Sequence, residues 1–498
     1  MISFVLCLLA LVAGYFLYGR FIERIVGPDD RPTPALVKAD GVDFIVMPDW
    51  KVFMIQFLNI AGTGPIFGAI MGAKFGPSSY LWIVFGCIFA GAVHDYLVGM
   101  LSIRNEGAGL PEIVGKYLGD GARKSMLVFT VFLLLLVGAV WVYSPAAILE
   151  QMAGTSTMWI ILIFLYYIVA TLMPIDKIIG RIYPFFAFSL LFMAAALFVV
   201  LVAKWPVIPE IWDGLGNKAM TVSPDWKDQL FPCLFITIAC GAISGFHATQ
   251  SPLMGRCLRS ERMGRPVFYG AMITEGIVAL VWAAVASYFF YGEPEPGYAL
   301  MQASSNEGFA TAAPKVVYVV CQDWLGLVGG ILAVIGVVAA PITSGDTAFR
   351  SARLIIADFL RMEQKSIVCR LSISVPLFVA CLMLLFWQFA NPDGFNVLWQ
   401  YFGWCNQSLA VFALWTATVF LVRKGKCYFV TLLPALFMTT VCATYLFVSR
   451  QMLGLPEVMG YALGLAVMVV ALVAFAVWLR RHRKSLGQRD DNSIIRQS

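Results

Sequence analysis

Long apolar runs separated by short polar connections make up nearly the whole chain. Thirteen of these runs approach or reach the length that a helix needs to cross the hydrocarbon core of a bilayer. The predicted spans are 2–19, 52–73, 79–103, 125–144, 157–173, 184–203, 229–252, 266–290, 326–348, 368–390, 396–422, 428–448 and 456–479. This pattern predicts an all-α polytopic membrane protein.

Composition supports the same class. Of 498 residues, 60% are hydrophobic and only 13% are charged, a balance that excludes a soluble globular domain. Eleven cysteines are dispersed, mostly inside apolar runs and without CxxC spacing, which argues against a disulfide framework and against structural zinc. We expect membrane lipid and a small-molecule substrate as partners, and no nucleic acid; the oligomeric state stays open.

Basic residues give the orientation. Of the 35 Lys and Arg, 29 fall in the odd-numbered connections and the C-terminal tail, and 6 fall in the even-numbered connections. Connections rich in Lys and Arg stay on the cytoplasmic side. The chain is therefore predicted to have its N-terminus outside and its C-terminus in the cytoplasm.

Two predicted spans are interrupted near their middle by helix-breaking residues. The first break reads Asn59-Ile-Ala-Gly-Thr-Gly-Pro65, and the second lies between Cys240 and Pro252. In lipid, free backbone groups are tolerated only where they face protein, a ligand or a water-filled cavity. A pair of broken spans in corresponding halves points to the binding site of a secondary transporter.

The breaks also reveal an internal repeat. The first of five spans within 50–203 begins inside, and the first of five spans within 229–422 begins outside, so the core 50–422 is predicted to be an inverted repeat. This arrangement resembles the LeuT-like fold of the amino acid–polyamine–cation superfamily, in which the first and sixth core helices are unwound at the substrate site. The other predicted parts are an extra N-terminal helix 1–25, an acidic outer lid 291–325, two C-terminal spans within 428–479 and a basic cytoplasmic tail 480–498.

Both breaks carry groups suited to a small anion. The amides of Gly62, Thr63 and Gly64 open a new half-helix, where free N–H groups and the positive end of the helix dipole attract a carboxylate. The second break adds four candidate substrate-binding residues: Ser244, Gly245, His247 and Gln250.

Ionisable residues within the spans are candidates for proton coupling. An intramembrane carboxylate or imidazole is a functional hypothesis by default, which selects Asp95, His247 and Asp346. The four-residue spacing of Asp346 and Arg350 favours an ion pair as the simpler role. The roles of His94 and Glu275 stay open.

A sodium ion is the alternative coupling ion. Ala340, Thr343 and Ser344 share one face of the ninth predicted span. In the LeuT-like fold this eighth core helix supplies a carbonyl and hydroxyls to a sodium site, and the resemblance implies the carbonyls of Asn59 and Gly62 as partners. We expect no cofactor other than coupling Na⁺ or H⁺.

Several stretches together resemble the carbon starvation protein A (CstA) family. They are Asn59–Pro65, Gly91–Tyr96, Ile243–Pro252, Ser344–Arg353 and Asn406-Gln407. The resemblance implies a bacterial inner-membrane protein that takes up peptides, or pyruvate by proton symport, in carbon starvation; this chain is a short form.

The sequence therefore predicts a secondary active, cation-coupled importer of a small carboxylate such as pyruvate, or of short peptides, and not an enzyme. A membrane-embedded nutrient sensor, a channel and a membrane enzyme remain as alternatives. No metal-ligand spacing such as HExxH supports the enzyme.

Overall fold

The computed structural model describes residues 1–41, 43–172, 175–218, 229–291, 309–362, 366–391 and 393–495. Every regular element in these ranges is helical, which confirms the all-α prediction. The α-helices are α1 Ile2–Phe16, α2 Tyr18–Val26, α3 Pro34–Val37, α4 Asp49–Ile60, α5 Gly64–Gly72, α6 Ser78–Gly86, α7 Ala92–Arg104, α8 Leu110–Leu118, α9 Asp120–Glu150, α10 Ser156–Leu172, α11 Ile175–Lys204, α13 Leu230–Thr237, α14 His247–Gly255, α15 Gly270–Tyr291, α17 Phe309–Leu360, α18 Ile367–Ala390, α19 Gly394–Arg423, α20 Phe429–Val448 and α21 Glu457–Ile495. Short 3-10 turns lie at η1 Ala73–Phe75, η3 Ile211–Asp213 and η4 Glu261–Met263, and π-helical turns at η2 Cys87–Gly91 and η5 Arg265–Tyr269.

The helices account for the predicted membrane spans. Among the described residues, ten helical segments are long and apolar enough to cross a membrane, and α4 with α5 forms an eleventh span that bends by 45°. The other two predicted spans coincide with α10, which has 17 residues, and with the short helices α13 and α14 on either side of the second break. The chain is thus a multi-span helical membrane protein.

One span ends later than predicted. Polar residues suggested an end at position 348, whereas α17 continues to Leu360. Arg350 and Arg353 in this extension are each only 3% exposed. Because neighbouring helices cover them, these charges do not end the helix.

The packing of the core follows the symmetry of an inverted repeat. α9 packs on α17, and these are the third helices of the two halves. Contacts in one half have equivalents in the other. The contact of α9 with α19 corresponds to the contact of α17 with α11. The contact of α7 with α14 corresponds to the contact of α15 with α4 and α5. The core therefore has the predicted LeuT-like arrangement, with broken first and sixth helices.

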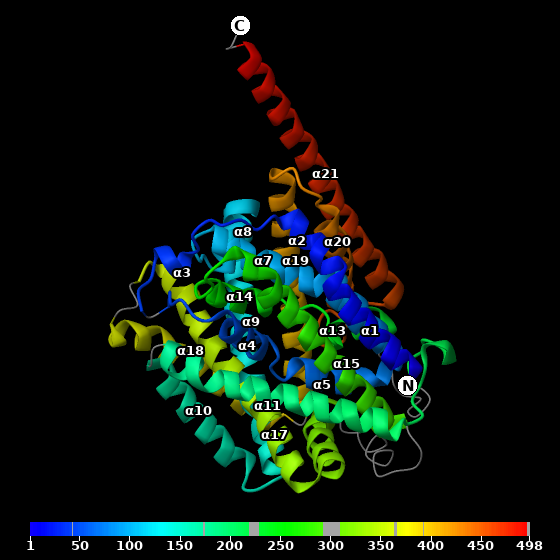
Figure 1. Ribbon diagram of the computed structural model, residues 1–498. Helices are drawn as coiled ribbons and strands as arrows, with labels where there is room; N and C mark the ends of the chain where they lie inside the picture. Colours follow the sequence, from blue (N-terminus) through cyan, green and yellow to red (C-terminus); the bar gives the residue numbers. More distant parts are fainter. Residues whose placement is uncertain are drawn as a thin grey trace.

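The flanking helices lie on the outside of this core. α1 packs on α15 and α6, and α20 lies between α19 and α21. Figure 1 shows α21 projecting beyond the body of the molecule. The predicted tail is helical as far as Ile495, because α21 runs on without interruption.

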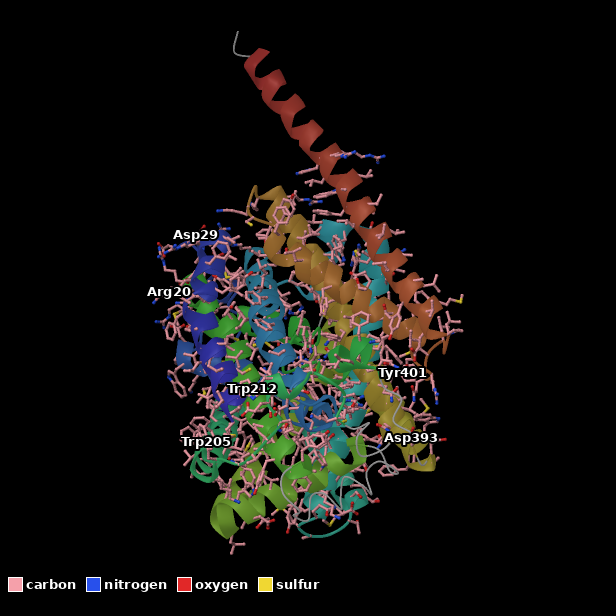
Figure 2. All side chains as sticks on the ribbon, turned by 90° about the vertical axis from the view of Figure 1, so that its right-hand side faces the viewer. Arg20, Asp29, Trp205, Trp212, Asp393 and Tyr401 are labelled. Atoms are coloured by element: carbon pink, nitrogen blue, oxygen red, sulfur yellow. The ribbon has the colours of Figure 1, made fainter. Side chains whose placement is uncertain are left out.

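Alternate connections lie at opposite ends of the molecule. Figure 2 shows Arg20 and Asp29, from the first connection, toward the end from which α21 projects. Trp205 and Trp212, from the sixth connection, and Asp393, from the tenth, lie toward the other end. We call these the tail end and the far end.

Part of the predicted lid is helical. Residues 292–308 of this segment lie outside the described ranges, but Phe309–Leu325 form the first part of α17 and join the rest at Gly326, whose φ is +64°. The ring of Trp324 lies 5.0 Å from Lys204 Nζ and 5.6 Å from the ring of Tyr288. This helical segment therefore packs against the C-terminal ends of α11 and α15, at the far end.

Two helix breaks and a buried acid–imidazole cluster

The first break leaves backbone donors free. α4 ends at Ile60 and α5 begins at Gly64, with proline in its first turn. Among the described residues, the amides of Gly62, Thr63 and Gly64 have no hydrogen-bond acceptor. The side chains of Asn59 and Thr63 are fully buried, and their polar atoms also lack partners. Unpaired backbone amides and two unpaired polar side chains thus occur in the segment where an anion site was predicted.

The second break is fastened by Asn406 on α19. Its Oδ1 accepts hydrogen bonds from Phe246 N at 2.7 Å and from Ser244 Oγ at 3.0 Å. Its backbone oxygen accepts from Gly245 N at 3.1 Å, and a side chain at Gly245 would collide with it. Asn406 therefore acts as interhelical glue, and the protons of Ser244 and Gly245 are already used within the protein.

The two breaks touch each other. A Cβ on Gly64 would overlap the side chain of Cys240, and a Cβ on Gly68 would lie 3.1 Å from the carbonyl oxygen of Thr237. Glycine is required at these positions for close approach, in addition to its helix-breaking effect. The free amides of the first break consequently lie beside the first residues of the second.

Three spans contribute ionisable groups to one buried cluster. Asp95 Oδ1 lies 2.8 Å from His94 Nδ1, and Asp95 Oδ2 lies 2.8 Å from His247 Nδ1. His247 Nε2 faces Glu275 Oε2 at 3.3 Å. The side chains in these contacts are all inaccessible to solvent. We call Asp95, His247 and Glu275 the acid–imidazole cluster.

The cluster joins residues that the predictions from sequence treated separately. Asp95 and His247 were both predicted as coupling residues, but nothing in the sequence paired them, and the role of Glu275 was left open. The π-helical turn η2 directly precedes α7, and such turns are frequent at functional sites. Gly91 in this turn lies so close to the carbonyl of Ala242 that no side chain would fit. α7 is thereby held against the second break.

His247 and Glu275 of this cluster, together with Cys240, have the composition and spacing to hold a metal ion. Cys240, His247 and Glu275 offer three ligand atoms within 4.8 Å of one another, all buried. Asp95 on the other imidazole nitrogen would orient His247, as carboxylates do beside metal-bound histidines. This set differs from the predicted sodium site.

Aromatic side chains close the space around the breaks. The ring of Trp141, on α9, packs edge-on against Phe246 with 4.6 Å between centroids. A Cβ on Gly62 would lie 2.7 Å from the same indole. Trp141 is fully buried and its Nε1 has no partner. Sequence reasoning missed this residue, because an indole within an apolar run gives no functional signal.

The hydroxyl protons of the predicted sodium ligands Thr343 and Ser344 are engaged within the protein. Ser344 Oγ donates to the Leu58 carbonyl at 3.0 Å, which brings α17 against the end of α4. Thr343 Oγ1 donates to the carbonyls of Ala339 and Ala340, at 2.8 and 2.9 Å. Oxygen lone pairs remain on both hydroxyls, while the Ala340 carbonyl is already an acceptor.

Asp346 has a different partner from the one that its spacing suggested. Tyr183 OH, on α11, donates to Asp346 Oδ2 at 2.8 Å, and Asp346 Oδ1 has no partner. Arg350 instead donates to the carbonyl of Ala170 at 3.2 Å. The interpretation as an Asp346–Arg350 ion pair is therefore wrong, because both side chains turn toward separate neighbouring helices.

Gln250 lies between α14 and α17. Its Nε2 donates to Thr249 Oγ1 at 2.9 Å and lies 3.5 Å from Ser351 Oγ, while its Oε1 has no partner. It is fully buried. The predicted substrate-binding and coupling residues are thus all enclosed, so a ligand reaches them only after helices move.

A cavity of about 620 Å³ opens at the tail end. Its lining comes from the first, third, seventh and ninth connections and from the end of α17. It includes both signs of charge, for example Arg256 and Asp358.

Comparison with solved structures supports the fold. A mutant of the Eremococcus coleocola manganese transporter superposes with a TM-score of 0.54 at 11% sequence identity, covering 89% of this chain and 99% of that one. At this identity the likeness concerns the fold alone.

Sequence relatives point to transport. A Haemophilus influenzae protein described only as an uncharacterized membrane protein is 45% identical over 58% of this chain and 91% of its own length. The peptide transporter CstA of Mycobacterium tuberculosis is 28% identical over 83% of this chain and 70% of its own. The pyruvate/proton symporter BtsT of Escherichia coli is 28% identical over 61% of this chain, which spans about half of BtsT.

The family assignment rests on nearly the whole chain. The family model described as carbon starvation protein CstA matches residues 1–144, 137–305 and 298–445. The chain therefore belongs to the CstA family and is a membrane transporter.

Proposed function

We propose that the protein is a proton-coupled importer of a small carboxylate of the pyruvate kind, with short peptides as the second candidate substrate. The observation that carries this proposal is the buried contact of Asp95, His247 and Glu275 beside the free amides of the first break.

The contact between His247 and Glu275 is favourable only when one of the two facing groups carries a proton. An ionised Asp95 can only accept a hydrogen bond, so in that state His247 Nδ1 carries a proton, while Nε2 faces the carboxylate of Glu275. An imidazole lone pair and a carboxylate repel each other at 3.3 Å unless one of them is protonated. One proton therefore belongs to this pair, and its loss or gain changes the forces between α14 and α15.

The substrate carboxylate is placed at Gly62, Thr63 and Gly64. Gly64 lies against Cys240, whose Sγ is within 4.8 Å of the ligand atoms of His247 and Glu275. The charge of an anion bound there would interact strongly with the charges of the acid–imidazole cluster, because the interior is dry and its dielectric constant is low. This proximity supports coupled movement of proton and anion.

Charge balance separates the two substrate classes. A monocarboxylate carried with one proton moves no net charge, so its uptake responds to the pH gradient alone. A zwitterionic peptide carried with one proton moves one positive charge, so its uptake also responds to the membrane potential. The curated relatives are named for both classes, as a pyruvate/proton symporter and as peptide transporters.

The test is uptake of labelled pyruvate and of a labelled dipeptide into proteoliposomes, with pH, sodium and potential gradients imposed one at a time. We expect pyruvate to accumulate under an inward proton gradient at zero potential, and Glu275→Gln to abolish accumulation. Asp120→Asn removes an exposed carboxylate at the start of α9 and should leave uptake unchanged. Accumulation by Glu275→Gln at the normal rate would overturn the assigned role of the cluster.

The same assay distinguishes sodium coupling from proton coupling. If a sodium gradient alone drives uptake, and Thr343→Ala with Ser344→Ala removes that response, the sodium site replaces the proton cluster. Accumulation against a gradient also separates the transporter from a channel, which passes its substrate only downhill.

The same proposal includes the orientation. The excess of Lys and Arg in the odd-numbered connections supports an orientation with the tail end in the cytoplasm and the N-terminus outside, in the inner membrane of a bacterium.

A further inference from the structure

A second cavity at the tail end has a lining of one charge sign. It measures about 300 Å³ and lies between the end of α2, the ends of α7 and α8, and the end of α19. Five cationic side chains and no carboxylate line it among the described residues: Arg31, Arg104, Lys116, Lys424 and Lys426.

Carboxylates that do not line the cavity neutralise its two arginines. Arg104 Nη2 lies 2.8 Å from Glu261 Oε2, and Arg31 lies 3.4 Å from Glu261 Oε1. Arg31 also pairs with Asp29, and hydrogen bonds from Arg31 hold the pKa of that carboxyl well below its usual range. Asp29 and Glu261 thus balance the charge of the arginines.

None of the three lysines forms an ion pair with a carboxylate among the described residues. Lys116 Nζ contacts the neutral amide oxygen of Asn105 at 2.5 Å. Lys424 and Lys426 form no ion pair with any described residue. A Cβ on Gly27 would lie 3.8 Å from Lys426 Nζ, so this ammonium group reaches across to the end of α2. Lys116 also interacts electrostatically with Glu106, which lies outside the cavity lining, so the ammonium groups of Lys424 and Lys426 are the ones that face the cavity without a carboxylate.

The cations come from distant parts of the chain. Arg31 follows α2, and Lys116 lies on α8. Lys424 and Lys426 follow α19, the last core helix. Figure 1 shows α2 and α8 together at the tail end. Like charges brought together in this way repel one another unless an anion lies between them.

We propose that this cavity binds a phosphate-bearing anion, with the ammonium groups of Lys116, Lys424 and Lys426 as its direct ligands. Basic pockets between spans on the cytoplasmic side are suited to phosphate headgroups of anionic lipids. A soluble polyphosphate offers the same chemistry. Binding would bridge the flanking helix α2 and the core, which otherwise meet there through Arg104 and the carbonyls of Val26 and Gly27.

The experiment compares lipid and soluble phosphate on the whole purified protein. One arm measures retention of phosphatidylglycerol and cardiolipin by native mass spectrometry, and the other measures the shift in melting temperature with sodium tripolyphosphate. The test variant is Lys424→Ala with Lys426→Ala. The matched control is Arg480→Ala with Arg481→Ala, which removes two exposed cations beyond the last span.

We expect the lysine variant to bind phosphate about ten- to thirtyfold more weakly, since each Lys near such a headgroup contributes about 1 kcal/mol. The arginine control should bind normally, and Lys424→Arg with Lys426→Arg should retain binding. A loss confined to one arm identifies the source of the phosphate. Equal binding by both alanine variants and the unmodified protein, or equal losses in both, would overturn the proposal.

Discussion

Replacing Asn406 with alanine should loosen the second break selectively. The substitution removes the acceptor for Phe246 N and for Ser244 Oγ, at 2.7 and 3.0 Å. The Ser244 hydroxyl has Cys240 Sγ as an alternative partner at 3.6 Å, but the Phe246 amide has none among the described residues. A buried N–H without an acceptor costs about 1–3 kcal/mol, so Asn406→Ala should lower the free energy of unfolding by that amount.

The neighbouring Gln407 provides the control. Its Nε2 donates a single hydrogen bond to the Phe235 carbonyl at 2.9 Å, within α13 and outside the break. Gln407→Ala should therefore cost only about 0.5–1.5 kcal/mol, the net value of one hydrogen bond. The two variants remove similar side chains from adjacent positions of one helix.

Thermal unfolding in detergent and uptake into proteoliposomes together test this reasoning. We expect Asn406→Ala to melt at a lower temperature than Gln407→Ala and to lose most of its transport, since the break would no longer hold Gly245 and Phe246 in place. Gln407→Ala should transport nearly normally. If both variants melt alike and both transport at the normal rate, Asn406 does not set the geometry of the break.

Three further predictions concern other contacts. Gly64→Ala should abolish uptake, because its Cβ would overlap Cys240; normal uptake would show that the breaks can separate. Tyr183→Phe removes the hydrogen bond to Asp346 and should lower stability by about 1–2 kcal/mol in thermal unfolding, without changing the stoichiometry of proton uptake. Cys427 is the exposed cysteine among the eleven; an impermeant maleimide should label it in inverted vesicles but not in intact cells, and the opposite result would reverse the orientation.

Hydrophobic pattern and charge alternation were sufficient for the fold. Lipid allows only structures whose backbone groups are satisfied internally, so apolar runs of spanning length become helices whatever surrounds them. Gly62, Pro65 and Gly245 interrupt helices through local chemistry, which is also visible in the sequence. The helical fold, the two breaks and the family were therefore predictable.

Distances between residues far apart in the chain were not predictable in the same way. Asp95, His247 and Glu275 belong to three spans, and only packing around Gly91 and Cys240 brings them together. The ion pair of Asp346 with Arg350 failed for the same reason, since spacing on one helix does not reveal a better partner on another.

The sequence by itself thus determined which segments are helices, where they break and which end is basic, because these follow from local backbone chemistry and from transfer into lipid. Tertiary structure alone decided which polar groups remain unpaired at the breaks and which ionisable side chains lie in contact. Those properties depend on contacts of a few ångströms between separate helices, and no periodicity along one chain records them.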